Sequence, residues 1–225
     1  MKKKWIIGSA VAAGFLAALL PIAKAIQALI EAPGMAVEDE VIQEVSDINQ
    51  FLRQQTISKE AMQQIKDSLD EDYTAFITRA RTIKSHLDNT KSEYMAYGAA
   101  ARLFHEYFPE VVETFQKTGK INVPKEKTRD FAKLCSMQID RLNNAARELD
   151  LAHNELINLK GDYEGKVENL AQVFFPFAKV IIDFKSNVKE KMENTEILKT
   201  MLSQLSEAGE KEIADVWKKL EKGTK

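Results

Sequence analysis

The stretch CSMQIDRLNNAARELDLAHNELINL, residues 135–159, decides the predicted fold. Mostly apolar or small residues recur in it at alternating steps of four and three: Cys135, Ile139, Leu142, Ala146, Leu149, His153 and Leu156. This heptad spacing places them on one seam of an α-helix. A wider set of positions joins the seam: Leu134, Ala145, Ala152 and Leu159. We therefore expect a helix over residues 125–160 that packs against several neighbouring helices.

Helical periodicity continues on both sides of this stretch. Before it, we expect helices from Gly34 to a turn at residues 54–56, then over 58–87 and 91–117. Pro109 should kink or break the last of these, and Gly119 should cap its end before a loop over 120–124. After it, we expect helical segments over 163–193, 196–208 and 213–220, and the sequence leaves open whether Asn194-Thr195 interrupts the first two.

The first expected helix has a clear apolar face, and the second has an acidic cluster. The first expected helix has Val41, Val45, Ile48 and Leu52 on its inner face, widened by Ile42 and Phe51. The second contains the acidic cluster Asp67, Asp70, Glu71 and Asp72 inside its helical pattern. A calcium loop needs a glycine for its sharp turn, and none is present, so we interpret the cluster as a solvated helix face.

The elements together predict an all-α fold. We expect an elongated bundle of five or six mainly antiparallel helices, preceded by an N-terminal hydrophobic segment. Residues 26–225 should form a single helical-bundle domain, because about two hundred residues suffice for one core.

The N-terminus predicts where the chain is located. Lys2, Lys3 and Lys4 precede a run without charge from Trp5 to Leu20, and Ala23-Lys24-Ala25 follows. This pattern is typical of a secretory signal peptide covering residues 1–25, cleaved after Ala25. The same run can be a retained membrane anchor, since the apolar character continues to Ile30. Either interpretation places the body outside the cytoplasm, secreted, periplasmic or membrane-anchored.

Charge and cysteine content narrow the functional classes. The chain has 32 basic and 34 acidic residues, and removal of residues 1–25 would leave a body with net charge −6. This balance does not favour nucleic acid as a partner. The single Cys135 excludes an internal disulfide, so packing alone must hold the fold.

The candidate catalytic and metal-ligating residues form no recognisable motif. His86, His105 and His153 fall on three expected helices, without the i, i+4 pairing of a helical zinc site. Cys135 and His153 are 18 residues apart on one helix, too far to form a catalytic pair. We interpret His153 as packed or partly buried and Cys135 as a buried thiol. We therefore expect no enzyme activity, metal or cofactor.

The segment 173–184 is the one unusual stretch of the body. It combines Pro176 with candidate lipid or partner contacts at Phe174, Phe175, Phe177, Ile181 and Phe184. Because a polar stripe through Lys179 and Asp183 leaves the remaining circumference apolar, we expect a helix surrounded by others at the centre of the bundle. The alternative is a segment that leaves the bundle and enters lipid or binds a partner.

The sequence therefore leaves two functional hypotheses. The first is an exported or membrane-tethered, non-enzymatic helical-bundle protein that acts by binding a protein partner, with a homo-oligomer as one form. The second is a lipid-active or pore-forming helical protein that uses the N-terminal segment or residues 173–184. In both, the N-terminal segment is the expected membrane contact.

Overall fold

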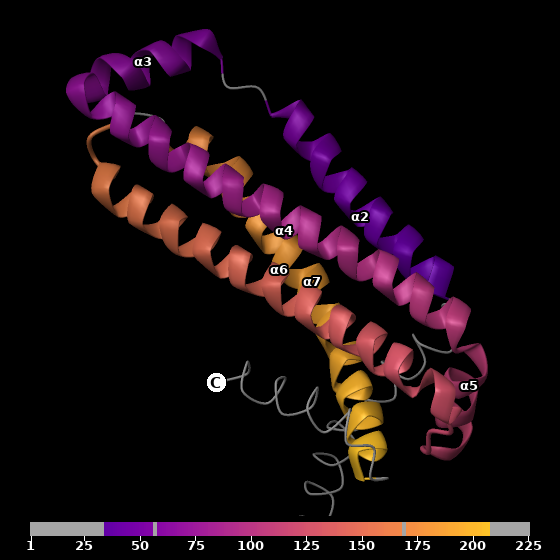
Figure 1. The fold of residues 1–225 in the computed structure, drawn as a ribbon. Coiled ribbons are helices and arrows are strands. Elements are labelled where there is room, and N and C mark those ends of the chain that lie inside the picture. Colours follow the sequence, from indigo (N-terminus) through magenta and orange to yellow (C-terminus); the bar gives the residue numbers. More distant parts are fainter. Residues whose placement is uncertain (1–33, 56–57, 168–169, 208–225) are drawn as a thin grey trace, which may run out of the picture. The chain divides into compact units, whose positions relative to one another are not determined.

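The computed structural model describes residues 34–55, 58–167 and 170–207 and shows an all-α protein (Figure 1). The elements are α2 (Gly34–Gln54), α3 (Lys59–Leu69), α4 (Tyr73–Tyr107), α5 (Pro109–Thr118), α6 (Thr128–Tyr163) and α7 (Leu170–Glu207). Two single-turn 3-10 helices, Asp70–Asp72 and Lys125–Lys127, precede α4 and α6. The predicted all-α bundle is confirmed, whereas residues 1–33 and 208–225, with the expected signal or anchor and the last helix, lie outside the described residues.

The chain forms two compact units, and α2, α4, α6 and α7 each contribute residues to both. Among the described residues, unit 2 contains residues 38–101 and 137–191, and unit 1 contains residues 34–37, 102–136 and 192–207. In unit 2, contacts between side chains define how the helices run. Arg79 contacts Glu155 and Glu93 contacts Arg141, so α4 and α6 are antiparallel. Glu40 contacts Lys191 and Phe51 contacts Phe175, so α2 and α7 are also antiparallel.

The predicted seam on α6 is the core of the bundle. Ile139, Leu142 and Leu149 are buried, as are Ala145, Ala152 and Leu159. Cys135 is fully buried in unit 1, as expected, and burial raises the pKa of its thiol. His153 is half-buried, which agrees with its expected partial burial.

The thin stretch of α4 around Gly98 lets α2 approach closely. A Cβ atom at Gly98 would lie 3.2 Å from the Cβ of Val41, closer than most real contacts. Val41, Val45 and Ile48 are buried on α2, but Ile42 and Leu52 are 44% and 37% exposed. The expectation that Ile42 and Leu52 belong to the inner face is therefore wrong, because only a narrow face of α2 packs on its neighbours.

The corner between α3 and α4 differs from the expected single helix over 58–87. The chain turns at Asp70, whose φ of 43° is in the left-handed region that Asp tolerates better than most residues. The Ser58 hydroxyl caps the start of α3 by accepting from the Ala61 amide at 3.1 Å. The acidic cluster is exposed, as expected, with Asp67 in the last turn of α3 and Asp70, Glu71 and Asp72 in the 3-10 turn that precedes α4. Helix α4 then continues through residues 88–90, where a break was expected.

Unit 1 contains the predicted break and cap. Pro109 is the first residue of α5, and Gly119 ends that helix with φ 66°. Phe104, Phe108 and Phe131 pack together with ring centroids 5.2–5.9 Å apart. Asn194 and Thr195 lie inside α7, so the open question of an interruption is answered by a continuous helix.

Candidate functional site

The five candidate contact residues of segment 173–184 do not lie on one surface. Phe174, Ile181 and Phe184 are buried, Phe177 is half-buried, and Phe175 is exposed. The structure thus corrects the expectation that α7 is surrounded except along its polar stripe. One further side of the helix, which includes Phe175, faces solvent.

That side carries two large apolar side chains. Phe175 is 58% exposed and Ile182 is 65% exposed. Seven residues make almost two turns, so both side chains point the same way, about 10 Å apart along the helix. The ring of Phe51 on α2 meets Phe175 edge to face, with centroids 6.4 Å apart. We call Phe175 and Ile182 the outer face of α7, and Phe51 of α2 borders it.

The charges beside this outer face are balanced internally. The Lys179 ammonium donates to both carboxylate oxygens of Asp183, at 2.8 and 2.9 Å. It also lies 5.4 Å from the centroid of the Phe51 ring, within the range of a cation–π contact. The outer face is therefore apolar, with a neutral ion pair at its edge.

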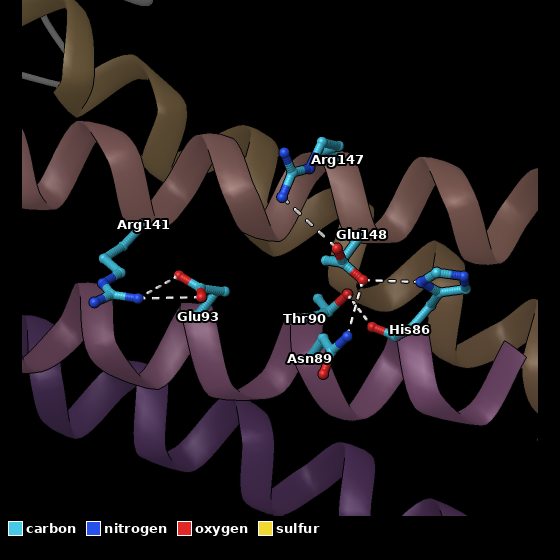
Figure 2. Close-up of polar contacts among 7 residues, drawn as sticks. All are labelled: His86, Asn89, Thr90, Glu93, Arg141, Arg147 and Glu148. Atoms are coloured by element: carbon cyan, nitrogen blue, oxygen red, sulfur yellow. Dashed lines mark hydrogen bonds and ion pairs between the residues drawn. The ribbon is translucent and has the colours of Figure 1, made fainter. Parts of the chain in front are cut away.

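A polar seam joins α4 to α6 in the same unit (Figure 2). His86 Nδ1 lies 2.8 Å from a Glu148 oxygen, and the Asn89 amide donates to the same oxygen at 3.1 Å. The hydrogen bond from His86, helped by Asn89, lowers the pKa of Glu148. Because an ionised carboxylate only accepts, Nδ1 must carry the proton in this contact.

Further along the seam, Arg141 donates to both oxygens of Glu93, at 3.1 and 3.0 Å (Figure 2). At the other end, Arg79 donates to Glu155 at 2.7 Å and also to Asp162. Both hydrogen bonds raise the pKa of Arg79, and the one with Glu155 has the larger effect. These contacts favour one register of α4 against α6, because sliding one helix along the other would separate all of these pairs at once.

The side chains of the polar seam between α4 and α6 do not form an aligned set of nucleophile, base and acid. His86 and Glu148 form an acid–base pair, but the nearby Thr90 hydroxyl donates to the His86 backbone carbonyl at 2.9 Å (Figure 2). That hydroxyl is therefore not aligned as a nucleophile toward the imidazole. Within residues 34–55, 58–167 and 170–207, no group of three His, Cys, Asp or Glu side chains is placed to hold a metal ion.

A second polar cluster is buried between α2, α4 and α7. The Lys191 side chain is only 5% exposed, and its ammonium lies 2.6 Å from Glu40 and 3.9 Å from Glu44. Tyr94 donates its hydroxyl proton to Glu44 at 2.5 Å. Burial raises the pKa of Glu44 despite the opposing effects of Tyr94 and Lys191, and burial also raises the pKa of Tyr94.

The other two histidines have separate surroundings. His153 Nδ1 lies 3.2 Å from the Lys185 ammonium, which can only donate, so this nitrogen accepts. His105 in unit 1 packs edge-on against Phe104, and burial lowers its pKa.

Comparison of the chain with protein-family models, with curated proteins and with solved structures finds no match. Among the helices that the structure describes, none is long and apolar enough to cross a membrane.

Sequence reasoning missed the roles of Glu148 and Lys191. A charged residue such as Glu148 is ordinarily expected on the surface, but its side chain is only 14% exposed because it points toward α4. A helical wheel places Glu148 beside the heptad seam of α6. This position could have indicated a hydrogen bond to a polar residue on a neighbouring helix. Lys191 follows a run of polar residues and gives no comparable signal.

Proposed function

We propose that the chain is a non-enzymatic helical-bundle protein, exported or tethered to a membrane by its N-terminal segment, that acts by binding a protein partner. We further propose that this partner is a second copy of the chain, bound through the outer face of α7. The observation that carries the proposal is the exposure of Phe175 and Ile182, at 58% and 65%, on one side of a helix. Large apolar side chains gathered on a surface favour a protein or membrane contact.

The spacing and charge of this face favour a second copy as the occupant. In an antiparallel pairing of two α7 helices about a two-fold axis, Phe175 of one copy packs beside Ile182 of the other. Such an isologous contact needs a self-complementary surface. Lys179 and Asp183 provide it, because the cation of one copy can approach the anion of the other. Since this pair is neutral, the face does not select a partner of opposite net charge.

Sedimentation velocity of the full chain in mild detergent tests this contact. We expect a dimer for the unchanged protein and a monomer for the double variant Phe175→Glu/Ile182→Glu, with dimerisation weakened at least about tenfold because charges would be buried. Leu151→Glu is the matched control, because Leu151 is 43% exposed on α6. Dimerisation that survives the double variant, or a monomeric unchanged protein, would contradict the self-association proposal.

The location rests on Lys2–Lys4 followed by the uncharged run from Trp5 to Leu20. Intact-mass analysis with cell fractionation tests it. We expect either loss of residues 1–25 or a full-length chain that pellets with membranes. A full-length chain that remains soluble in the cytoplasm would contradict both. Dye release from liposomes would instead support the lipid-active or pore-forming alternative.

A further inference from the structure

The segment that joins α5 to α6 has an excess of positive charge. We call residues 117–129 the basic loop; it contains one acid, Glu126, and five bases: Lys117, Lys120, Lys125, Lys127 and Arg129. The whole chain, in contrast, has slightly more acids than bases. All five basic side chains are exposed, so this charge faces solvent.

Four of these five cations have no ion-pair partner among the described residues. Lys117 pairs with Glu113 one turn earlier, at 2.5 Å. In the part of the chain that the structure describes, no ion pair involves the other four bases: Lys120, Lys125, Lys127 and Arg129. Single exposed bases elsewhere, such as Lys59 and Lys189, also have no ion pair among the described residues, but they are not gathered in one short segment as the bases of the basic loop are. The exposed positive charge gathered in the basic loop can therefore attract an external anion.

The basic loop is held in a defined conformation. Gly119 adopts a left-handed conformation, and the Gln204 side chain of α7 bridges the turn that follows. Its amide donates to the Gly119 carbonyl at 2.8 Å, and its oxygen accepts from the Ile121 amide at 3.1 Å. Farther along, the Thr128 hydroxyl donates to the Pro124 carbonyl at 3.2 Å. Little loop ordering is therefore left to oppose binding.

Three of these cations lie at a helix start that disfavours positive charge, and Glu126 and Asp130 at the same end offset only part of it. Lys125, Lys127 and Arg129 lie in and beside the first turn of α6, where the helix dipole is positive. Cations at this end are normally disfavoured. An external anion would relieve the repulsion between these cations and the positive end of the α6 dipole. The position of the cations therefore also favours binding of an anion.

We infer that the basic loop contacts the anionic surface of a lipid bilayer through Lys120, Lys125, Lys127 and Arg129, which pair with headgroup phosphates. A nucleic acid fits less well, since sites for single strands combine cations with aromatic side chains, and residues 117–129 contain no aromatic residue. A flat bilayer can meet one loop while the acidic remainder of the chain faces away. This contact is independent of the outer face of α7.

Partition of the full chain into lipid vesicles tests the inference. The quantity to measure is the ratio of partition coefficients for phosphatidylcholine vesicles with and without phosphatidylglycerol. Binding through the N-terminal segment, including its Lys2–Lys4, is the same in the unchanged and variant proteins, so it cancels when their ratios are compared. The fourfold variant Lys120→Gln/Lys125→Gln/Lys127→Gln/Arg129→Gln should lower the ratio about a hundredfold or more, since each cation contributes about fivefold.

The control removes the same charge elsewhere. Its fourfold change to Gln affects exposed bases of unit 2: Lys59, Lys66, Arg81 and Lys189. We expect it to change the ratio by only a few fold, and added salt should abolish the difference between the two variants.

Three results would overturn the inference. These are a ratio near one for the unchanged protein, an equal loss in the loop and control variants, or loop-dependent binding to a short DNA duplex without any preference for anionic vesicles. The double variant Phe175→Glu/Ile182→Glu should keep the full ratio, so failure of this inference and failure of the proposed self-association are distinguishable.

Discussion

The two sides of α7 within segment 173–184 differ sharply although both are apolar. On the inner side, Val180, Ile181 and Phe184 are at most 2% exposed, whereas on the outer side Phe175 and Ile182 are more than half exposed. The contrast is sharpest at the neighbours Ile181 and Ile182, at 1% and 65%. Apolar character all round a helix therefore does not mean burial all round it. One side holds unit 2 together, and the other is available to a further molecule.

The largest expected effect comes from a charge on the inner side. Ile181→Asp must bury a carboxylate without a partner, which forces unfolding or a strongly raised pKa. We expect loss of cooperative unfolding in a denaturant melt followed by circular dichroism. Ser186→Asp is the control, because Ser186 is exposed. It should change the free energy of unfolding by less than about 0.5 kcal/mol. An Ile181→Asp protein that still melts cooperatively near the midpoint of the unchanged protein would remove the distinction between the two sides.

Lys191→Met tests a polar contact that is buried like Ile181. The substitution leaves Glu44 and Glu40 without their cation, and breaking a buried ion pair destabilises by several kcal/mol. Since Glu40 remains 47% exposed, we expect about 3 kcal/mol, at the lower end of that range. Lys189→Met, at an exposed position, should have almost no effect on urea denaturation. Equal midpoints for the two variants would show that the Lys191 contacts contribute nothing.

Glu148→Gln should have an intermediate effect, because Glu148 lies at the edge of the core. It weakens hydrogen bonds from His86 and Asn89 to a charged acceptor, so we expect a loss of about 1–2 kcal/mol at pH 7. The pKa of Glu148 is lowered in the folded state from an ordinary value of 4.5. The ionised carboxylate therefore stabilises the fold above pH 4.5, and this contribution is lost as the pH falls through the lower folded-state pKa.

The corresponding measurement is chemical denaturation of both proteins over a pH series. The difference in unfolding free energy between the unchanged protein and Glu148→Gln should shrink below pH 4.5. A difference that stays constant with pH would mean that the contact does not depend on ionisation of Glu148.

Glu44→Gln should have the smallest effect and the opposite pH dependence. Burial raises the folded-state pKa of Glu44 above 4.5, so its contribution to stability is complete below 4.5 and is lost as the pH rises through that raised value. The unchanged protein should therefore gain stability relative to Glu44→Gln as the pH falls toward 4.5. The same denaturation series measures this, and a change in the same direction as for Glu148→Gln would contradict the assigned cause.

The sequence predicted the elements that depend on local pattern. The heptad seam of α6, the break at Pro109 and the cap at Gly119 follow from helix geometry and backbone chemistry, and the structure confirms all three. The corner at Asp70 was not predictable from periodicity, because apolar residues keep their helical spacing on both sides of it.

The candidate site was predicted only in part. The apolar segment 173–184 could be identified from its composition, but its inner and outer sides depend on which neighbours α7 has. Periodicity cannot supply that, since Ile181 and Ile182 are the same residue type. The positive charge of residues 117–129 was visible in the sequence, yet only the structure shows that these side chains are exposed and that four of the five form no ion pair with other described residues.

The single substitution Ile182→Asp tests the central claim most directly, when its unfolding curve and its sedimentation velocity are measured on the same sample. The side chain is 65% exposed, so the account predicts a melting midpoint close to that of the unchanged protein, together with loss of the dimer. A stable Ile182→Asp protein that still sediments as a dimer would contradict the claim that the outer face of α7 binds a second copy.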